Sequence, residues 1–146
     1  MHATFLRPAL ATLTLSALLF TGVSAFAEMV SYKADLKAST EVPPNDSKGT
    51  GVVEATYDTT SKKFSWTITY SGLTGPATAA HFHGPAAANA TAPPVVPLSG
   101  DLASPIKGNA TLTDAQAADL QAGRWYFNIH TAAHPVGELR GQVMKK

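Results

Sequence analysis

The sequence contains no cysteine, and only 14% of its 146 residues are charged. The absence of cysteine excludes a disulfide framework and thiolate ligands, so any metal site must use nitrogen, oxygen or thioether donors. An excess of positive charge is also missing, because 11 basic residues stand against 10 acidic ones and are scattered along the chain. We therefore expect no nucleic-acid partner.

A long hydrophobic run is lacking as well, apart from a short one near the N-terminus. Arg7 precedes an apolar run from Ala9 to Phe20, and Ala25-Phe26-Ala27 then offers a small-x-small cleavage site. The run is shorter than the ~20 residues that a membrane span needs, which disfavours an uncleaved anchor. We predict that residues 1–27 are a signal peptide and that residues 28–146 form one exported domain, periplasmic or secreted, with no membrane attachment after cleavage.

Apolar and polar residues alternate with a period of two along most of the mature chain, which predicts half-buried β-strands. The strongest example places Phe64, Trp66, Ile68 and Tyr70 between small polar residues. Similar patterns begin at Val30, Val53, Trp125 and Leu139, and weaker ones cover residues 78–83 and 106–112.

A single helix is expected. Thr113 and Gln116 form a capping-box pattern, the alanine-rich stretch after them favours helix, and Gly123 is placed to end it. Seven or eight short strands with one short helix predict an all-β fold, an antiparallel sandwich with Greek-key connections. An open barrel is the alternative.

Histidine is concentrated in two strand-like segments. His81 and His83 flank Phe82, so the period-two rule puts Phe82 in the core and both histidines on the opposite face. In the same way Asn128 and His130 lie on the polar, water-facing side of their strand.

A hairpin is expected to join the last two strands. If residues 131–137 form its loop, a symmetric register places His130 opposite Glu138 and Asn128 opposite Arg140. The carboxylate of Glu138 can then fix the tautomer of a metal-bound His130, or it can form an ordinary ion pair.

These positions define a candidate transition-metal site. We predict His81, His83 and His130 as ligands, with His134 on the adjoining loop as a possible fourth, because imidazole suits copper and zinc. We expect Glu138, Asn128 and Arg140 to orient the ligands from behind. The affinity order of divalent ions favours copper over zinc.

Other readings of the same residues stay open. The histidines can be hydrogen-bonding residues that tie loops to a sheet edge, without any metal. The long loops at residues 40–50 and 84–94 can carry recognition on a rigid scaffold, although no residue in them identifies a protein or ligand partner. Catalysis has little support, because a G-x-S-x-G motif and paired carboxylates are both absent from the sequence.

The order and spacing of several motifs resemble the CHRD domain, a family first named from chordin and widespread in exported bacterial proteins. The resemblance covers the whole mature chain and rests on Glu41-Val42-Pro43-Pro44, Tyr70-Ser71-Gly72-Leu73, His81-Phe82-His83-Gly84-Pro85, His130-Thr131 and Gly137-Glu138-Leu139-Arg140-Gly141-Gln142. It implies an Ig-like β-sandwich outside the cytoplasm and no particular biochemical activity. The growth-factor role of chordin is not implied, because this chain lacks the cysteine-rich modules.

The strand-borne His-x-His with a distant histidine is also similar to the copper site of copper-zinc superoxide dismutases, which are β-sandwiches. This chain lacks the cysteines of those enzymes and has no aspartate cluster for a second metal. A dismutase-like copper enzyme is therefore the least favoured function, and we predict a non-catalytic protein.

Overall fold

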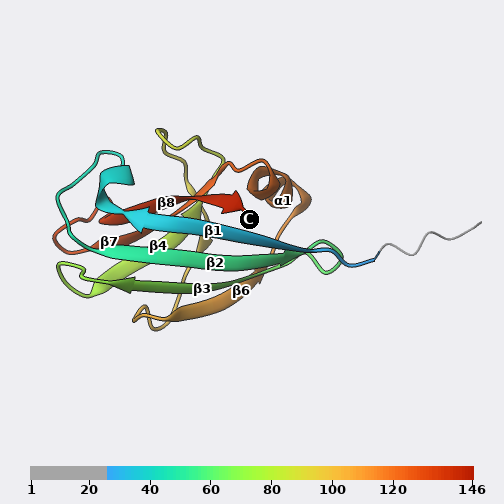
Figure 1. Ribbon diagram of the computed structural model, residues 1–146, viewed down its shortest axis with the longest axis horizontal. Helices are drawn as coiled ribbons and strands as arrows, with labels where there is room; N and C mark the ends of the chain where they lie inside the picture. The colour runs from blue at the N-terminus through green and yellow to red at the C-terminus, as the bar shows by residue number, and fades with distance from the viewer. Residues whose placement is uncertain (1–25) are drawn as a thin grey trace, which may run out of the picture.

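The computed structural model describes residues 26–146; the predicted leader, except for its last two residues, lies outside this part. Eight strands and one α-helix follow one another along the chain (Figure 1). They are β1 (Met29–Lys37), β2 (Thr50–Asp58), β3 (Lys63–Ser71), β4 (Ala77–His83), β5 (Pro94–Pro97), β6 (Ile106–Thr111), α1 (Asp114–Gln121), β7 (Trp125–Thr131) and β8 (Leu139–Lys145), with a short 3-10 turn η1 (Ala38–Thr40) after β1.

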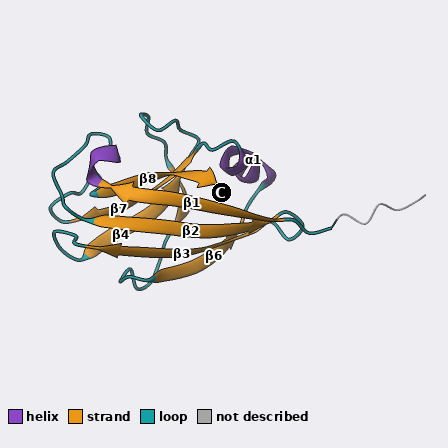
Figure 2. Cartoon of the chain, in the orientation of Figure 1, coloured by secondary structure: helices purple, strands orange, loops and turns teal. Residues whose placement is uncertain are grey.

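All eight strands belong to one antiparallel sheet in the order β5-β4-β7-β8-β1-β2-β3-β6. Pairing between β8 and β1 is interrupted, with three paired positions that share one register: Tyr32 with Lys145, Lys33 with Met144 and Lys37 with Arg140. Figure 2 shows β1, β2 and β3 in front of β8, β7 and β4. The all-β antiparallel fold with one short helix is confirmed, and the continuity of the sheet makes it barrel-like.

The core lies between the two layers and is filled by the apolar side of the predicted alternation. In β1 every second residue from Val30 to Leu36 is buried, and the residues between them are exposed. Phe64 of β3 meets Phe82 of β4 from the opposite layer, with 5.1 Å between ring centroids. Each such buried aromatic side chain stabilises the fold by about 1.5–3 kcal/mol, so this contact fixes β4 firmly to the core.

Helix α1 closes one end of the core, beside β8 (Figure 1). The predicted capping box is present, because Thr113 Oγ1 accepts from Gln116 N and Gln116 Oε1 accepts from Thr113 N. The helix stops before Gly123, whose φ of +69° suits glycine. No helix among residues 26–146 has the length and apolarity needed to cross a membrane.

Candidate metal centre

The register between β4 and β7 brings the predicted histidines together. His81 lies opposite Asn128, and Ala79 lies opposite His130 in the same antiparallel ladder. Because side chains alternate between the two faces of a strand, His81, His83, Asn128 and His130 all project from the face opposite the core. One compact group thus forms from two strands, with His81 and His83 spaced i and i+2 on β4 and Asn128 and His130 spaced i and i+2 on β7.

The histidine cluster, meaning His81, His83 and His130, has the spacing of a metal site. One ring nitrogen of each residue lies within 4.8 Å of the others. His81 Nδ1 and His130 Nε2 are 3.3 Å apart. Two ligands bound tetrahedrally at about 2.0 Å from one ion are separated by about 3.3 Å, so this pair already has ligand spacing.

Backbone carbonyls hold two of the rings from behind. His83 Nδ1 lies 2.8 Å from the carbonyl oxygen of Ala92, and His130 Nδ1 lies 3.0 Å from that of Pro135. A carbonyl oxygen only accepts, so each Nδ1 carries the proton and donates it. The neutral tautomer of each ring therefore has its lone pair on Nε2, where it can bind a metal ion.

The side-chain oxygen of Asn128 completes the group. Asn128 Oδ1 lies 3.0 Å from His83 Nε2 and 3.0 Å from His130 Nε2. Each of these two rings therefore has an acceptor oxygen beside both of its nitrogens, while a neutral imidazole has a single proton to donate. Three acceptor atoms thus meet at one place, with His81 Nδ1 beside them, and a proton or a cation can be shared there.

Electrostatics disfavour an additional proton on His81 or His83. Burial lowers the pKa of His83, its hydrogen bonds to Ala92 and Asn128 oppose the shift, and the charges of His130 and Arg140 lower the pKa further. Burial also lowers the pKa of His81, with His130 and His83 acting in the same direction. Both shifts disfavour the charged form of the His81 and His83 rings.

The expectation of a water-facing cluster is wrong for half of these residues. His83 and Asn128 are buried, with 7% and 4% of their surface exposed, whereas His81 and His130 are half-buried. The covering loop, residues 84–93, lies over this face of the sheet and shields it from water. The period-two rule places side chains on a face correctly, but it carries no information on whether a loop covers that face.

Three side chains of the sheet hold the covering loop in place. Arg140 Nη2 donates to the carbonyl oxygens of Ala87, Ala88 and Ala90, and Gln142 Nε2 donates to that of Ala86. The hydroxyl of Tyr126 accepts from the amide nitrogen of Ala92 at 3.2 Å. Asn128 does lie opposite Arg140, as predicted, but Arg140 supports the loop and makes no hydrogen bond to a histidine.

The predicted pair between His130 and Glu138 is not formed. The carboxylate of Glu138 accepts hydrogen bonds from Ser47 Oγ, Thr74 N, Thr74 Oγ1 and Thr131 Oγ1. Regular pairing between β7 and β8 ends at Ile129 and Leu139, so the face of Glu138 no longer follows the alternation. The Glu138 side chain lies on the core side with Thr131, away from the ring of His130, and does not orient that ring.

The fourth predicted ligand, His134, lies outside the cluster. It belongs to the turn between β7 and β8, where its backbone N donates to the carbonyl of Thr131 and its own carbonyl accepts from Thr131 N. Asn128 Oδ1 stands where a fourth donor atom was expected. The sequence assigned Asn128 only an orienting role.

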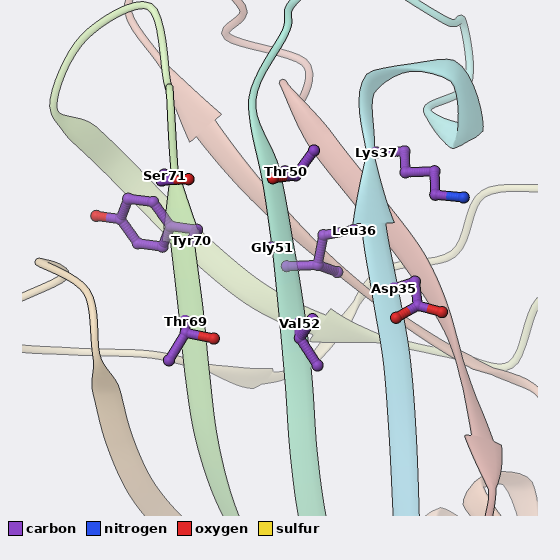
Figure 3. A pocket seen from close by; sticks show the side chains of 9 residues that line it. All are labelled: Asp35, Leu36, Lys37, Thr50, Gly51, Val52, Thr69, Tyr70 and Ser71. Atoms are coloured by element: carbon purple, nitrogen blue, oxygen red, sulfur yellow. The ribbon is translucent and has the colours of Figure 1, made fainter.

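Hollows of similar size lie at several places away from the histidine cluster. One, of about 410 Å³, is on the outside of β1, β2 and β3, where Figure 3 shows Leu36 and Tyr70 on either side of Gly51. Another, of about 470 Å³, lies between residues 39–44 and the covering loop, and Arg140 and Gln142 form part of its wall. Neither hollow has a histidine in its lining.

The family model named CHRD domain matches residues 32–143. The chain therefore belongs to the CHRD domain family, as its motifs indicated. No curated protein and no solved structure gave a match.

Several contributors to the site were not found from the sequence. The carbonyl groups of Ala92 and Pro135 carry no side-chain signal, and their positions depend on loop conformation. Glu41 was noted only as part of a motif, yet it is 4% exposed and lies beside Asn128. Burial raises the pKa of Glu41, although hydrogen bonds from Val42 N and Asn128 and the charge of Arg140 lower it in part.

Proposed function

We propose that this CHRD-domain protein is an exported, non-catalytic protein that binds one transition-metal ion, copper or zinc, through His81 Nδ1, His83 Nε2 and His130 Nε2. One observation carries the proposal. Both ring nitrogens of the buried His83 face acceptor oxygens, Ala92 O at 2.8 Å and Asn128 Oδ1 at 3.0 Å. A neutral imidazole donates to only one of them, and a cation on the Nε2 side would satisfy the other.

The surroundings of His130 support the same conclusion. Its Nδ1 faces Pro135 O and its Nε2 faces Asn128 Oδ1, each at 3.0 Å. Protonation of both rings would put two positive charges side by side near the buried Arg140. A single metal ion satisfies all of these lone pairs at once, and backbone carbonyls behind the rings are the usual partners of metal-bound histidines.

The donor set favours copper or zinc among biological metals. Three imidazole nitrogens with one amide oxygen form a site of borderline softness, and the absence of thiolate ligands is compatible with Cu(II). Between the two ions, the general affinity order favours Cu(II). His81 and His130 are half-buried, so the ion reaches the site from their side.

Export is the second part of the proposal. The n-region with Arg7, the apolar run and the Ala25-Phe26-Ala27 site support cleavage before Glu28. N-terminal sequencing of the protein produced in a Gram-negative host, and its recovery from the periplasmic fraction, test this directly. A cytoplasmic product that retains residues 1–27 contradicts export without affecting the metal site.

Metal analysis tests the metal site. The protein isolated from the periplasm and dialysed against Cu(II) or Zn(II) is expected to retain about one ion per chain, and His81→Ala and His130→Ala are expected to lose it. Cu(II) electron paramagnetic resonance of the wild type should show nitrogen hyperfine structure from imidazoles. Equal metal content in all three proteins contradicts the metal site and leaves a metal-free binding module as the function. Superoxide consumption by the copper-loaded protein would contradict its non-catalytic character.

A further inference from the structure

We infer that Glu41 is a positioning residue that fixes the side-chain amide of Asn128, so that Oδ1 and not Nδ2 faces the histidine cluster. The metal-binding consequence of this inference rests on the proposed function, whereas the orientation of the amide does not. Glu41 opens the Glu41-Val42-Pro43-Pro44 motif, which the proposed site left without a role.

The carboxyl group of Glu41 and the amide nitrogen of Asn128 meet at Gly137. A Cβ atom built on Gly137 would lie 2.6 Å from Glu41 Cδ and 2.9 Å from Asn128 Nδ2, so both groups pack against the same α-carbon. Glu41 Oε2 accepts from Val42 N at 3.2 Å, while Oε1 is buried and its only donor within residues 26–146 is the side chain of Asn128, whose hydrogen bond lowers the pKa of Glu41 in part. Asn128 Nδ2 is thus the donor available to that oxygen.

The segment that carries Glu41 is firmly attached at this place. The side-chain Nδ2 of Asn45 donates to the carbonyl oxygen of Glu138 at 3.0 Å, and its backbone N donates to the carbonyl oxygen of Ala38. Thr40 Oγ1 donates to the carbonyl of Arg140. Glu41 therefore approaches Asn128 from a rigid support and not from a free loop.

A flip of the Asn128 amide would reverse the chemistry of the cluster. It would put the carbonyl oxygen of Asn128 against the Glu41 carboxyl and direct the Nδ2 donors at His83 Nε2 and His130 Nε2. The two lone pairs would then be satisfied by hydrogen bonds, and an ion would have to break them in order to bind. Glu41 prevents this by accepting from Nδ2, so it keeps the cluster as a set of acceptors.

A double-mutant cycle separates positioning from general damage. Zn(II) affinity is measured by chelator competition for the wild type, Glu41→Leu, Asn128→Ala and the double variant. We expect Glu41→Leu to weaken Zn(II) binding about 10–100-fold in the wild-type background and by less than about 3-fold in the Asn128→Ala background. Glu41→Gln keeps an acceptor oxygen and should restore most of the affinity.

Asp46→Leu is the matched control, because it removes the same charge from an exposed position of the same segment. Its Zn(II) affinity should equal that of the wild type. An equal loss from Glu41→Leu in both backgrounds, or no loss in either, overturns the inference while leaving the proposed metal site intact. A wild type that binds no Zn(II) or Cu(II) instead removes the proposed function.

If the wild type binds no metal, a measurement on the metal-free protein still tests the orientation of the Asn128 amide. In ¹H–¹⁵N spectra of the apo-protein, the Nδ2 protons of Asn128 should show a hydrogen bond to an oxygen acceptor in the wild type and in Glu41→Gln. In Glu41→Leu they should move to the imidazole nitrogens, with a change in the ¹⁵N shifts of His83 and His130 Nε2. Unchanged Asn128 and histidine signals in Glu41→Leu overturn the inference without reference to any metal.

Discussion

The guanidinium carbon of Arg140 lies 3.5 Å from the centre of the Tyr126 ring. The same ring stacks on His83, with 4.6 Å between centroids and an interplanar angle of 4°. Arg140 comes from β8 and His83 from β4, so Tyr126 of β7 lies between a cation and a proposed metal ligand. The three side chains tie the covering loop, the sheet and the histidine cluster into one unit.

This arrangement predicts that Arg140 is important for stability. Arg140→Met removes hydrogen bonds to three loop carbonyls and a cation–π contact, and should lower the free energy of unfolding by about 2–4 kcal/mol. Urea denaturation measures the change. The same replacement at the exposed Arg124 should cost less than about 0.5 kcal/mol, and comparable losses at both positions would contradict the role given to Arg140.

The low pKa of Glu138 predicts that the free energy of unfolding decreases in acid. Burial raises its pKa, but hydrogen bonds from Ser47, Thr131 and Thr74 outweigh burial and bring the pKa from 4.5 to about 2. Because the folded-state pKa is the lower one, the stabilisation is complete above about pH 5 and is lost as the pH falls toward 2. Urea titrations between pH 7 and 2 should show the wild type approaching Glu138→Gln over that window. A constant difference between the two proteins would contradict the prediction.

Three glycine-to-alanine variants separate the steric cost of a new Cβ atom from the cost of a positive backbone φ. Gly137→Ala should be strongly destabilising, because φ is +136° and the new Cβ would overlap Glu41. Gly100→Ala has a φ of +87° but no atom within 4 Å, so it should cost only about 1 kcal/mol. Gly75→Ala has neither problem and should leave the melting temperature nearly unchanged. If thermal unfolding ranks Gly100→Ala as the most harmful, the contact with Glu41 is unimportant.

His134→Ala distinguishes the cluster seen in the structure from the larger ligand set suggested by the sequence. Because His134 lies outside the cluster, the variant should retain one ion per chain with an affinity within about 3-fold of the wild type. Isothermal titration with Zn(II) gives both quantities. A loss as large as that of His130→Ala would restore His134 as a ligand.

Most of the fold could be predicted because its strands obey one simple rule. The alternation around Trp66 and the capping box at Thr113 are local signals, and the core and helix follow them residue by residue. The antiparallel partners of β4 were not predicted. Pairing between strands so far apart in sequence depends on packing of the whole sheet, which a period-two pattern does not encode.

The site was predictable to the extent that it depends on strand faces. His81, His83 and His130 share a face by alternation alone, and the structure brings them together. The errors concern the ends of strands and the loops. Glu138 was misplaced because regular pairing stops just before it, and the burial of His83 was missed because the conformation of residues 84–93 could not be read from sequence.

The donor atoms of the cluster all come from one two-stranded ladder, in which residues 79–83 pair with residues 126–130 without interruption, and the register shift of that ladder falls beyond them, between Ala77 and Ala79. Insertion of one residue between His81 and His83 would therefore turn one imidazole toward the core and scatter the set, whereas lengthening a surface turn elsewhere would leave it intact. The placement of the three imidazoles on one face is thus a property of a short ribbon, whereas the orientation of the His83 and His130 rings also depends on the carbonyls of Ala92 and Pro135 outside it.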